Sequence, residues 1–526
     1  MEEQVEQIEQ SGAPARRRVG RFDGGIVLPG HKTDGGELLA APIPAEIVLA
    51  LHQHFGEPAL PCVAPGQRVL RGELIANPDG HVSAALHAST SGVVRAIEDR
   101  PVPHPSGRVA RCIVIEPDGE DRAIDAGPAV DFRRLGPAAL RARVRASGIV
   151  GLGGAAFPTS VKLTARADMH VQTLILNGAE CEPYISCDAA LVQTRPERVV
   201  RGAQIMLHAL QVNECLIAVE SDRVDAGRAL ETAIEQAGDE RIELVRVAAR
   251  YPEGGERQLI QALTGREVPS DGLPIDIGFV CQNLGTAAAV ADALEDRPLT
   301  SRIVTVTGPG VRVAHNIEAR IGTPVADLIT LCGGYADDVQ RLVMGGPMMG
   351  FALPTDAVPV VKATNCILAL TTPLLRALDD EQPCIRCNEC ARACPARLQP
   401  QELYRHTRAG AFEQVQALHV FDCIECGCCD LVCPSHIPLA QAFRYAKGEL
   451  WAEERERQRR QVARLRYELR EGRMAAAEAE RRARRSVPGQ AEGATVGTEV
   501  DPRAQVIREA VERTRAKREQ RDPPLA

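Results

Sequence analysis

Two stretches near the carboxyl end decide the character of the last globular part of the chain: Cys384-Ile-Arg-Cys387-Asn-Glu-Cys390-Ala-Arg-Ala-Cys394-Pro395 and Cys423-Ile-Glu-Cys426-Gly-Cys-Cys429-Asp-Leu-Val-Cys433-Pro434. Both read C-x2-C-x2-C-x3-C-P. Three thiolates spaced two residues apart can wrap an iron–sulfur cubane along one tight loop, and the proline then turns the chain away. The two stretches therefore predict a domain that holds two [4Fe–4S] clusters of the bacterial ferredoxin type.

The spacing also predicts which cysteines share a cluster. In two-cluster ferredoxins the fourth cysteine of each run ligates the other cluster. One predicted ligand set is therefore Cys384, Cys387, Cys390 and Cys433, and the other is Cys423, Cys426, Cys429 and Cys394. A pair of zinc sites is the competing interpretation, but zinc usually takes two separated C-x2-C pairs.

The remaining cysteines do not follow this pattern. Cys428 lies inside the second run but breaks its spacing, so we interpret it as a thiol outside the ligand set. Isolated free cysteines are usually small buried apolar side chains. We expect this for Cys62, Cys112, Cys215, Cys281, Cys332 and Cys366.

The bulk composition limits the class of protein. A chain of 526 residues is longer than one core uses, so several domains are expected. A net charge of −8 argues against nucleic acid as a partner. No apolar run reaches the ~18 residues that a spanning helix needs. The acidic, polar first residues are not a secretory signal. We expect a cytoplasmic protein that docks on a membrane through partners.

The periodicity of the chain changes several times and predicts an α/β multidomain protein. Short runs rich in Val, Ile, Gly and Pro predict β structure from residue 24 to about 121. From 148 to about 293, apolar runs such as Thr173–Leu176 alternate with helical stretches such as Arg223–Ala237. That alternation favours a largely parallel sheet. Residues 301–350 predict a smaller β-rich unit.

The tail has a different composition. Residues 451–486 contain 12 Arg and 7 Glu, a local charge of 12 − 7 = +5. Their few apolar residues, Val462, Leu465 and Leu469, form at most one thin helical stripe. A solvated or partly disordered charged helix is the main interpretation. The alternative is a helix that docks on a partner or on anionic lipid heads.

A glycine-rich loop, Gly148-Ile-Val-Gly151-Leu-Gly153-Gly154-Ala-Ala-Phe157, is followed by Lys162. Such a loop lets backbone N–H groups approach a phosphate, and the lysine adds a point charge. It is not a Walker A loop, and a purely structural turn is the alternative. Two acidic elements follow, Asn177-Gly-Ala-Glu-Cys-Glu-Pro183 and Tyr251-Pro-Glu-Gly-Gly-Glu256. Acids near such a loop can hold ribose or ribityl hydroxyls.

These elements resemble the FMN- and NADH-binding flavoprotein subunit of respiratory complex I. The chain is more similar still to the RnfC family, the C-type component of the Rnf ion-translocating oxidoreductase complex, from Gly24 to about Lys447. That resemblance includes Asn177-Gly-Ala-Glu-Cys-Glu-Pro-Tyr184, Gly345-Gly-Pro-Met-Met-Gly350 and both cysteine runs. It implies non-covalent FMN that takes hydride from the substrate NADH and two [4Fe–4S] clusters that carry single electrons onward.

The resemblance to the complex I flavoprotein also implies roles for individual residues. The loop glycines and a lysine would cradle the FMN phosphate: Gly151, Gly153, Gly154 and Lys162. Side chains lining the flavin would be Asn177, Glu180, Asn283 and Thr286. Phe157 would stack on the nicotinamide dinucleotide, and Glu182 and Glu256 would act catalytically at its ribose or ring. The chain departs from the complex I pattern at Leu152, Ala179 and Gly255.

The first domain resembles a different class of fold. Residues 63–76 and 87–97 resemble the two halves of a biotinyl- or lipoyl-type barrel-sandwich domain. A carrier domain of that type needs a lysine for its covalent arm, and residues 33–161 contain none. We therefore expect a structural sandwich rather than a swinging arm.

Together these observations predict the following organisation: 1–20 disordered; 21–130 a barrel-sandwich hybrid domain; 131–298 an FMN/NADH-binding α/β domain; 299–365 a small β-grasp-like SLBB unit; 370–447 a helical two-[4Fe–4S] ferredoxin-type domain; and 448–526 a charged helical or disordered tail. The resemblance implies a peripheral subunit on the cytoplasmic face of a bacterial inner membrane. Its partners would be the other Rnf proteins (A, B, D, E and G types), including integral membrane subunits, and a ferredoxin-type redox protein. The alternatives are a soluble NADH diaphorase subunit of a hydrogenase-like complex, or an electron-conducting docking module without nicotinamide chemistry.

Overall fold

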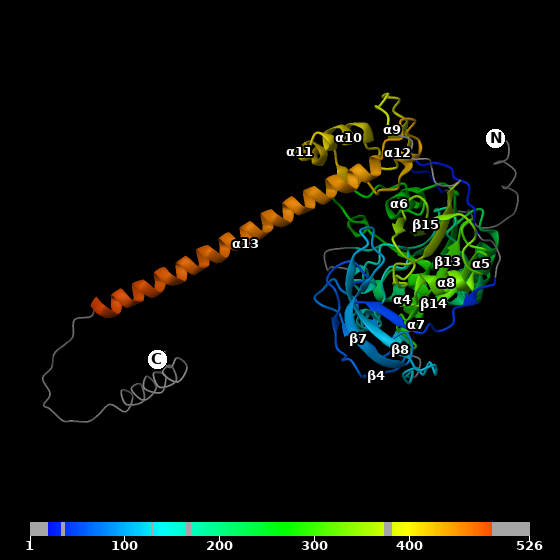
Figure 1. Ribbon diagram of the computed structural model, residues 1–526, viewed down its shortest axis with the longest axis horizontal. Coiled ribbons are helices and arrows are strands. Elements are labelled where there is room, and N and C mark those ends of the chain that lie inside the picture. Colours follow the sequence, from blue (N-terminus) through cyan, green and yellow to red (C-terminus); the bar gives the residue numbers. More distant parts are fainter. Residues whose placement is uncertain (1–18, 33–36, 128–129, 165–169, 373–380, 487–526) are drawn as a thin grey trace, which may run out of the picture. The chain divides into compact units, whose positions relative to one another are not determined.

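The computed structural model describes residues 19–32, 37–127, 130–164, 170–372 and 381–486 (Figure 1). The chain divides into two units, Met1–Trp451 and Ala452–Ala526. The predictions of disorder before residue 19 and of a tail beyond residue 486 lie outside the described residues.

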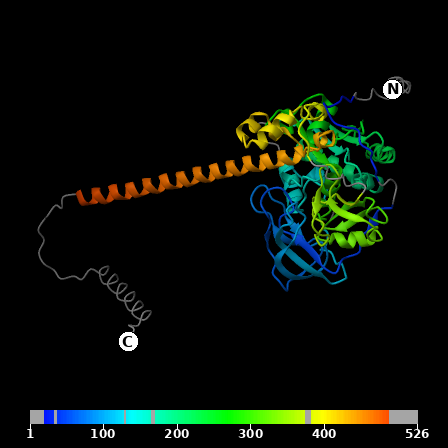
Figure 2. The ribbon, with the colours of Figure 1, turned by 45° about the horizontal axis from the view of Figure 1, so that its top comes forward.

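The first domain is a sandwich of two small antiparallel sheets (Figure 2, blue). One sheet has the order β2-β8-β7-β4, and its strands are β2 (Ile47–Ala50), β8 (Val109–Pro117), β7 (Gly92–Pro101) and β4 (Arg68–Val69). The other sheet has the order β3-β5-β6, with β3 (Leu60–Pro61), β5 (Leu74–Asn77) and β6 (Leu86–His87). Fully buried Ile47, Ile75 and Ile113 contribute to the core of this domain. The barrel-sandwich prediction is confirmed.

One cysteine of this domain corrects an expectation. Cys62 is exposed, because it follows the exposed edge strand β3. The prediction that it would be buried is wrong. Cys112, Cys215, Cys281, Cys332 and Cys366 are buried as expected.

The central domain contains a four-stranded parallel sheet in the order β11-β10-β9-β12. Its strands are β9 (Thr173–Gly178), β10 (Cys215–Glu220), β11 (Ile242–Val247) and β12 (Phe279–Asn283). The helices of this domain are α1 (Pro137–Ala146), α2 (Thr159–Lys162), α3 (Cys187–Thr194), α4 (Pro196–Leu210), α5 (Val224–Ala237), α6 (Glu256–Thr264) and α7 (Leu284–Ala293). Two 3-10 turns are Phe132–Arg134 and Pro274–Ile277.

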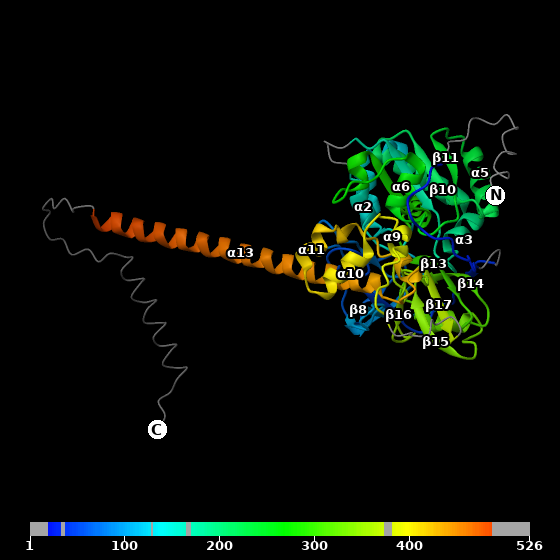
Figure 3. The same cartoon turned by 90° about the horizontal axis from the view of Figure 1, so that it is seen from above.

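Both faces of this sheet are covered, because successive strand side chains point to opposite sides. Leu174, Leu176 and Ile217 pack into the core shared with α4, α5 and α7. Ile175 and Leu216 pack instead against residues of α6. Figure 3 shows α5 close to β10 and β11. The parallel sheet predicted from the alternating pattern is confirmed.

The order of the strands creates a switch point beside β9. The chain runs from β9 to β10 and β11 on one side and then crosses to β12 on the other. Asn177 and Asn283 are register partners at the carboxyl ends of β9 and β12. Ligands of open parallel sheets bind at this position, outside the carboxyl ends of the strands.

The third domain is built on a six-stranded mixed sheet in the order β1-β14-β13-β17-β15-β16. Its elements are β1 (Leu39–Ala40), β13 (Ser301–Thr307), β14 (His315–Arg320), α8 (Val325–Leu331), β15 (Val339–Met344), β16 (Phe351–Leu353) and β17 (Cys366–Thr371). The sheet includes β1 and β17, which lie outside the predicted range 299–365.

The cysteine domain is helical, and α9 to α12 are the yellow helices of Figure 1. Its elements are α9 (Glu389–Ala393), α10 (Pro400–Arg408), α11 (Phe412–Ala417), the 3-10 turn Val420–Asp422, α12 (Cys428–Leu431) and the start of α13 (Leu439–Ser486). Leu403, Val415 and Phe443 form its core with Cys429 and Cys433.

In the second unit, α13 continues as a single helix to Ser486. Its described side chains from 455 to 483 are exposed, including Val462, Leu465 and Leu469. Ion pairs four residues apart, such as Arg464–Glu468, line this helix. The prediction of a charged helix is confirmed for these residues. Among the described residues, no helix is both long and apolar enough to cross a membrane.

Candidate functional site

The eight cysteines of the two runs line two separate pockets of the helical domain. The residues lining the first pocket include Cys394, Cys423, Cys426 and Cys429, together with Cys428. Those lining the second include Cys384, Cys387, Cys390 and Cys433. Each pocket thus collects three thiols of one run and the fourth thiol of the other. All of these thiols are free, and each pocket offers the same four cysteines as one predicted ligand set.

Backbone geometry shapes the loops around these pockets. Glu425 and Gly427 adopt positive φ angles of 58° and 74°, which turn the chain tightly between cysteines of the second run. Backbone amides point at sulfur: Leu398 donates to the Cys394 Sγ and Glu425 donates to the Cys423 Sγ, both at 3.4 Å. Such hydrogen bonds stabilise thiolate charge and are one determinant of a cluster's reduction potential.

The two pockets differ in burial. Cys384 and Cys387 of the second pocket are exposed, whereas Cys426 and Cys429 of the first are buried. We call them the exposed pocket and the buried pocket. Solvent exposure is a further determinant of cluster potential, so the two sites are not equivalent.

The glycine-rich loop lies against the amino end of α7. Leu152 donates its backbone N–H to the Thr286 Oγ1 at 2.9 Å. A Cβ on Gly153 would lie 3.4 Å from the Asn283 Cβ, so glycine permits this close approach. The Asn283 side chain accepts from the Thr286 N–H at 3.2 Å and caps the helix. A glycine loop beside a helix amino terminus can offer backbone N–H groups to a phosphate. These residues therefore fit the phosphate group of FMN.

Lys162 lies close to Glu256. Its Nζ donates to the Glu256 Oε1 at 2.6 Å and to the Cys281 carbonyl at 3.1 Å. Burial is the largest single effect and would lower the pKa of Lys162, but the charge of Glu256, the neighbouring Cys281 and the hydrogen bond to Glu256 together raise that pKa. The lysine is therefore a permanent cation near the switch point.

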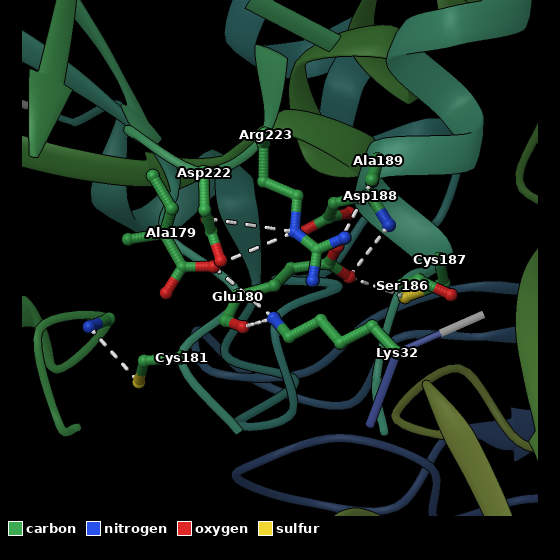
Figure 4. Close-up of polar contacts among 12 residues, drawn as sticks. Lys32, Ala179, Glu180, Cys181, Ser186, Cys187, Asp188, Ala189, Asp222 and Arg223 are labelled. Atoms are coloured by element: carbon green, nitrogen blue, oxygen red, sulfur yellow. Dashed lines mark hydrogen bonds and ion pairs between the residues drawn. The ribbon is translucent and has the colours of Figure 1, made fainter. Parts of the chain in front are cut away.

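Glu180 caps α3 and interacts with the half-buried Asp188 (Figure 4). Its carboxylate accepts from the backbone N–H groups of Asp188 at 2.8 Å and Ala189 at 3.0 Å. Asp188 in turn accepts a hydrogen bond from the Asn283 amide. Burial first, and then the charge of Glu180, raises the pKa of Asp188 to about 8. Glu180 thus organises the peptide segment beside the predicted flavin site.

The side chains of Asn177 and Glu182 form hydrogen bonds with the backbone of two other loops. The Asn177 amide donates to the Gly254 carbonyl at 2.9 Å, which joins the two acidic elements. Glu182 accepts from the backbone N–H groups of Met348 at 3.2 Å and Met349 at 2.7 Å. Burial raises the pKa of Glu182 to about 7. The Phe157 ring packs against Phe55 of the first domain, with ring centroids 5.7 Å apart.

A cation that the sequence did not predict, Lys32, has its side chain buried at the carboxyl edge of the sheet. Lys32 points into this region in Figure 4, donates to the Glu180 carbonyl and lies 3.2 Å from the Glu220 carboxylate. Both side chains of this ion pair are almost fully buried. The only sequence signal was the position of Lys32 as the last lysine before a long stretch without one.

Four family models match successive parts of the chain. They are the RnfC barrel sandwich hybrid domain at 20–120, the Nuo51 FMN-binding domain at 144–292, the SLBB domain at 303–352 and the 4Fe-4S dicluster domain at 381–479. Together with the two cysteine pockets, these matches define the class: a flavoprotein that holds FMN and two [4Fe–4S] clusters.

Curated relatives identify the family. The chain is 46% identical over 512 residues to the C-type component of the ion-translocating oxidoreductase complex of Pseudomonas aeruginosa, covering 95% of this chain and 65% of the relative. It is 43% identical over 470 residues to the corresponding protein of Salmonella gallinarum, covering 89% of this chain and 69% of the relative. The chain belongs to the RnfC family, the C-type components of ion-translocating oxidoreductase complexes. It spans 65% of the length of the Pseudomonas relative and 58% of that from Erwinia tasmaniensis.

A solved structure aligns with part of the chain. A chain of the NAD+-reducing [NiFe]-hydrogenase in the H2-reduced state aligns with a TM-score of 0.44 and 20% identity. The alignment covers 62% of this chain and 66% of that one.

Proposed function

We propose that this chain is the peripheral electron-entry subunit of a membrane-bound ion-translocating complex, which oxidises NADH or runs in reverse. The observation that carries the proposal is that one chain contains two cysteine pockets and a glycine loop that can bind a phosphate. When bound, FMN exchanges hydride with NADH and single electrons with the two [4Fe–4S] clusters, which is redox chemistry that side chains do not supply. The enzyme class proposed is an NADH–ferredoxin-type translocase subunit.

The residues have distinct proposed roles. One cluster is held by Cys384, Cys387, Cys390 and Cys433, and the other by Cys394, Cys423, Cys426 and Cys429. The FMN phosphate is held by Gly151, Gly153, Gly154 and Lys162. Asn177, Glu180, Asn283 and Thr286 position the flavin, directly or by ordering its loops. Phe157 packs against the dinucleotide, and Glu182 and Glu256 act at its ribose or ring. The two cysteine sets are supported by the lining of the pockets, because each pocket contains three cysteines of one run and the fourth cysteine of the other.

We also propose the domain limits 21–130, 131–298, 299–365 and 370–447, with terminal segments 1–20 and 448–526. The proposed partners are the other proteins of the complex (A, B, D, E and G types) and a ferredoxin-type protein. The proposed location is the cytoplasmic face of the inner membrane. Co-isolation with integral membrane subunits is the expected result of affinity purification. A stable complex without membrane subunits would instead support a diaphorase of the hydrogenase type.

Two contacts favour a second candidate, an electron-conducting module without nicotinamide chemistry. The carboxylate of Glu182 is engaged by two backbone N–H groups of the 345–350 loop, and Phe157 packs against Phe55. Both residues would need to release these contacts to meet a dinucleotide in the proposed way.

A cofactor assay followed by an NADH titration separates the two candidates. The reconstituted chain is expected to hold one FMN and about eight irons with matching sulfide. NADH should then bleach the flavin absorbance. Bound flavin that dithionite reduces and NADH does not would reject the nicotinamide assignment and favour the second candidate.

A further inference from the structure

The buried pocket is fastened to the central domain by a tyrosine. The Tyr251 hydroxyl donates a hydrogen bond to the Cys426 carbonyl at 2.7 Å. Tyr251 is only 2% exposed and packs with Ala393, Cys426 and Cys428. A buried hydroxyl without a partner is unfavourable, so this bond fixes both the ring and the cysteine loop.

The same tyrosine is tied to the proposed flavin site through its own chain segment. Its backbone exchanges two hydrogen bonds with Ile26, at 2.8 and 2.9 Å. Three residues later, the Gly254 carbonyl accepts from Asn177. Two residues after that, Glu256 pairs with Lys162. The segment 251–256 therefore connects groups at the carboxyl edge of the sheet with a cysteine loop of the buried pocket.

The amino-terminal segment closes against the same pocket. Gly25 donates its N–H to the Ala393 carbonyl at 2.9 Å. A Cβ on Gly24, whose φ is +65°, would lie 2.5 Å from the Cys394 carbonyl oxygen. Cys394 and Cys426 are thus both held by segments of the chain outside the helical domain.

The exposed pocket has a different surrounding. Two of its thiols face solvent, and hydrogen bonds between described residues beside it join parts of the helical domain. Ser435 donates to the Pro383 carbonyl at 3.0 Å, and Gln382 donates its N–H to Ser435 at 2.9 Å. Tyr404 lines this pocket, and its hydroxyl donates to Glu381.

We propose that Tyr251 is a positioning residue that holds the buried pocket against the flavin domain and, through the Cys426 carbonyl, sets the reduction potential of the cluster in that pocket. The inference rests on the proposed function. An O–H dipole directed at a ligand carbonyl favours the more negative, reduced form of a cluster. Loss of that donor therefore lowers the potential. The buried pocket is the flavin-side site, and the exposed pocket is the site from which a partner exchanges electrons.

Redox titration of the full-length reconstituted chain, followed by EPR, tests the inference. Cys423→Ser and Cys387→Ser identify the signals of the buried and the exposed pocket. In Tyr251→Phe, which keeps the ring and removes only the hydroxyl, the buried-pocket signal should shift to lower potential while the exposed-pocket signal stays unchanged. The matched control, Tyr404→Phe, should leave the buried-pocket signal where it is.

The other possible results for Tyr251→Phe are equally decisive. Selective loss of the buried-pocket signal, with about four irons remaining, also supports the positioning role. An unshifted buried-pocket signal, or a change confined to the exposed pocket, overturns the inference and leaves the proposed function intact. A wild-type chain that assembles no clusters overturns both.

Discussion

Lys162 illustrates how single residues at the switch point depend on one another. Its ammonium is held between the Glu256 carboxylate and the Cys281 carbonyl, one from the second acidic element and one from β12. The glycine loop begins before α2, and Lys162 ends that helix. Lys162 thus follows the glycine loop in the chain and places its positive charge beside β12 and the second acidic element.

Replacement of Lys162 by alanine should weaken FMN retention, because a phosphate would lose its point-charge partner and Glu256 would become an uncompensated anion beside it. Flavin content after gel filtration, read from absorbance, measures the effect. Lys162→Arg keeps the charge and should recover much of the retention. Equal flavin content in the alanine variant and the wild type would reject the assignment.

Glu182 should make stability depend on pH. Its pKa is raised from 4.5 to about 7 by burial, so the folded chain binds this proton more tightly than the unfolded chain. The stabilisation is complete below pH 4.5 and is lost as pH rises through 7. Glutamine cannot ionise, so the melting temperature of Glu182→Gln relative to wild type should increase from pH 5 to pH 8. A difference that is constant over this range would show that Glu182 does not titrate there.

At the scale of elements, α4 and α7 cover one face of the parallel sheet and pack closely on each other. Gly202 of α4 makes this possible, since a Cβ there would lie 1.9 Å from the Ala287 carbonyl oxygen. Backbone atoms cannot move aside as a flexible side chain does. The position of α7 matters for the site, because its amino end carries Asn283 and Thr286.

Gly202→Ala should therefore destabilise the chain by about 1–3 kcal/mol through overpacking. Gly448→Ala is the matched control: it also lies within a helix, but a Cβ at that position meets nothing within 4 Å. That variant should be neutral or slightly stabilising, because alanine favours helix more than glycine. Denaturant unfolding of both variants measures the difference. Equal unfolding midpoints for Gly202→Ala and Gly448→Ala would mean that α4 and α7 can move apart without loss of stability.

Across the whole molecule, one buried lysine joins three domains. The Lys362 ammonium donates to the Ala85 carbonyl of the first domain at 2.7 Å and to the Gly148 carbonyl at the start of the glycine loop at 2.6 Å. Its backbone N–H donates to Gln53 at 3.0 Å. Burial lowers the pKa of Lys362 to about 7. The sandwich is thus anchored to the flavin domain, in keeping with a structural rather than a carrier role.

Each proposed cluster takes cysteines from both runs, so a single cysteine replacement should have a predictable effect on the iron content of the whole domain. Cys387→Ser and Cys426→Ser should each remove one cluster and leave about four irons per chain. Iron and sulfide analysis, with EPR of the reduced chain, measures the loss. Cys428→Ser serves as the control and should retain about eight irons, because it lies outside the proposed ligand sets. Retention of all the irons in either of the first two variants would contradict those sets.

Much of this architecture could be predicted because its signals are local. Thiol spacing within each run determined the cluster type, and apolar runs alternating with helical stretches determined the parallel sheet. Burial of Cys62 was predicted wrongly, since its exposure depends on which strand forms an edge. The engagement of Glu180 at α3 and of Glu182 with Met348 and Met349 was not predictable, because partners in other loops compete for the same carboxylates.

By itself, then, the sequence predicted two four-cysteine sites and a separate flavin-type glycine loop, because coordination chemistry depends on residue type and short spacing. Only the tertiary structure decided that one cysteine pocket is buried against the flavin domain and the other is exposed. That distinction arises from contacts such as Tyr251 to Cys426, whose partners are 175 residues apart. Burial and polarity depend on which distant segments exclude water together, and no local pattern encodes that.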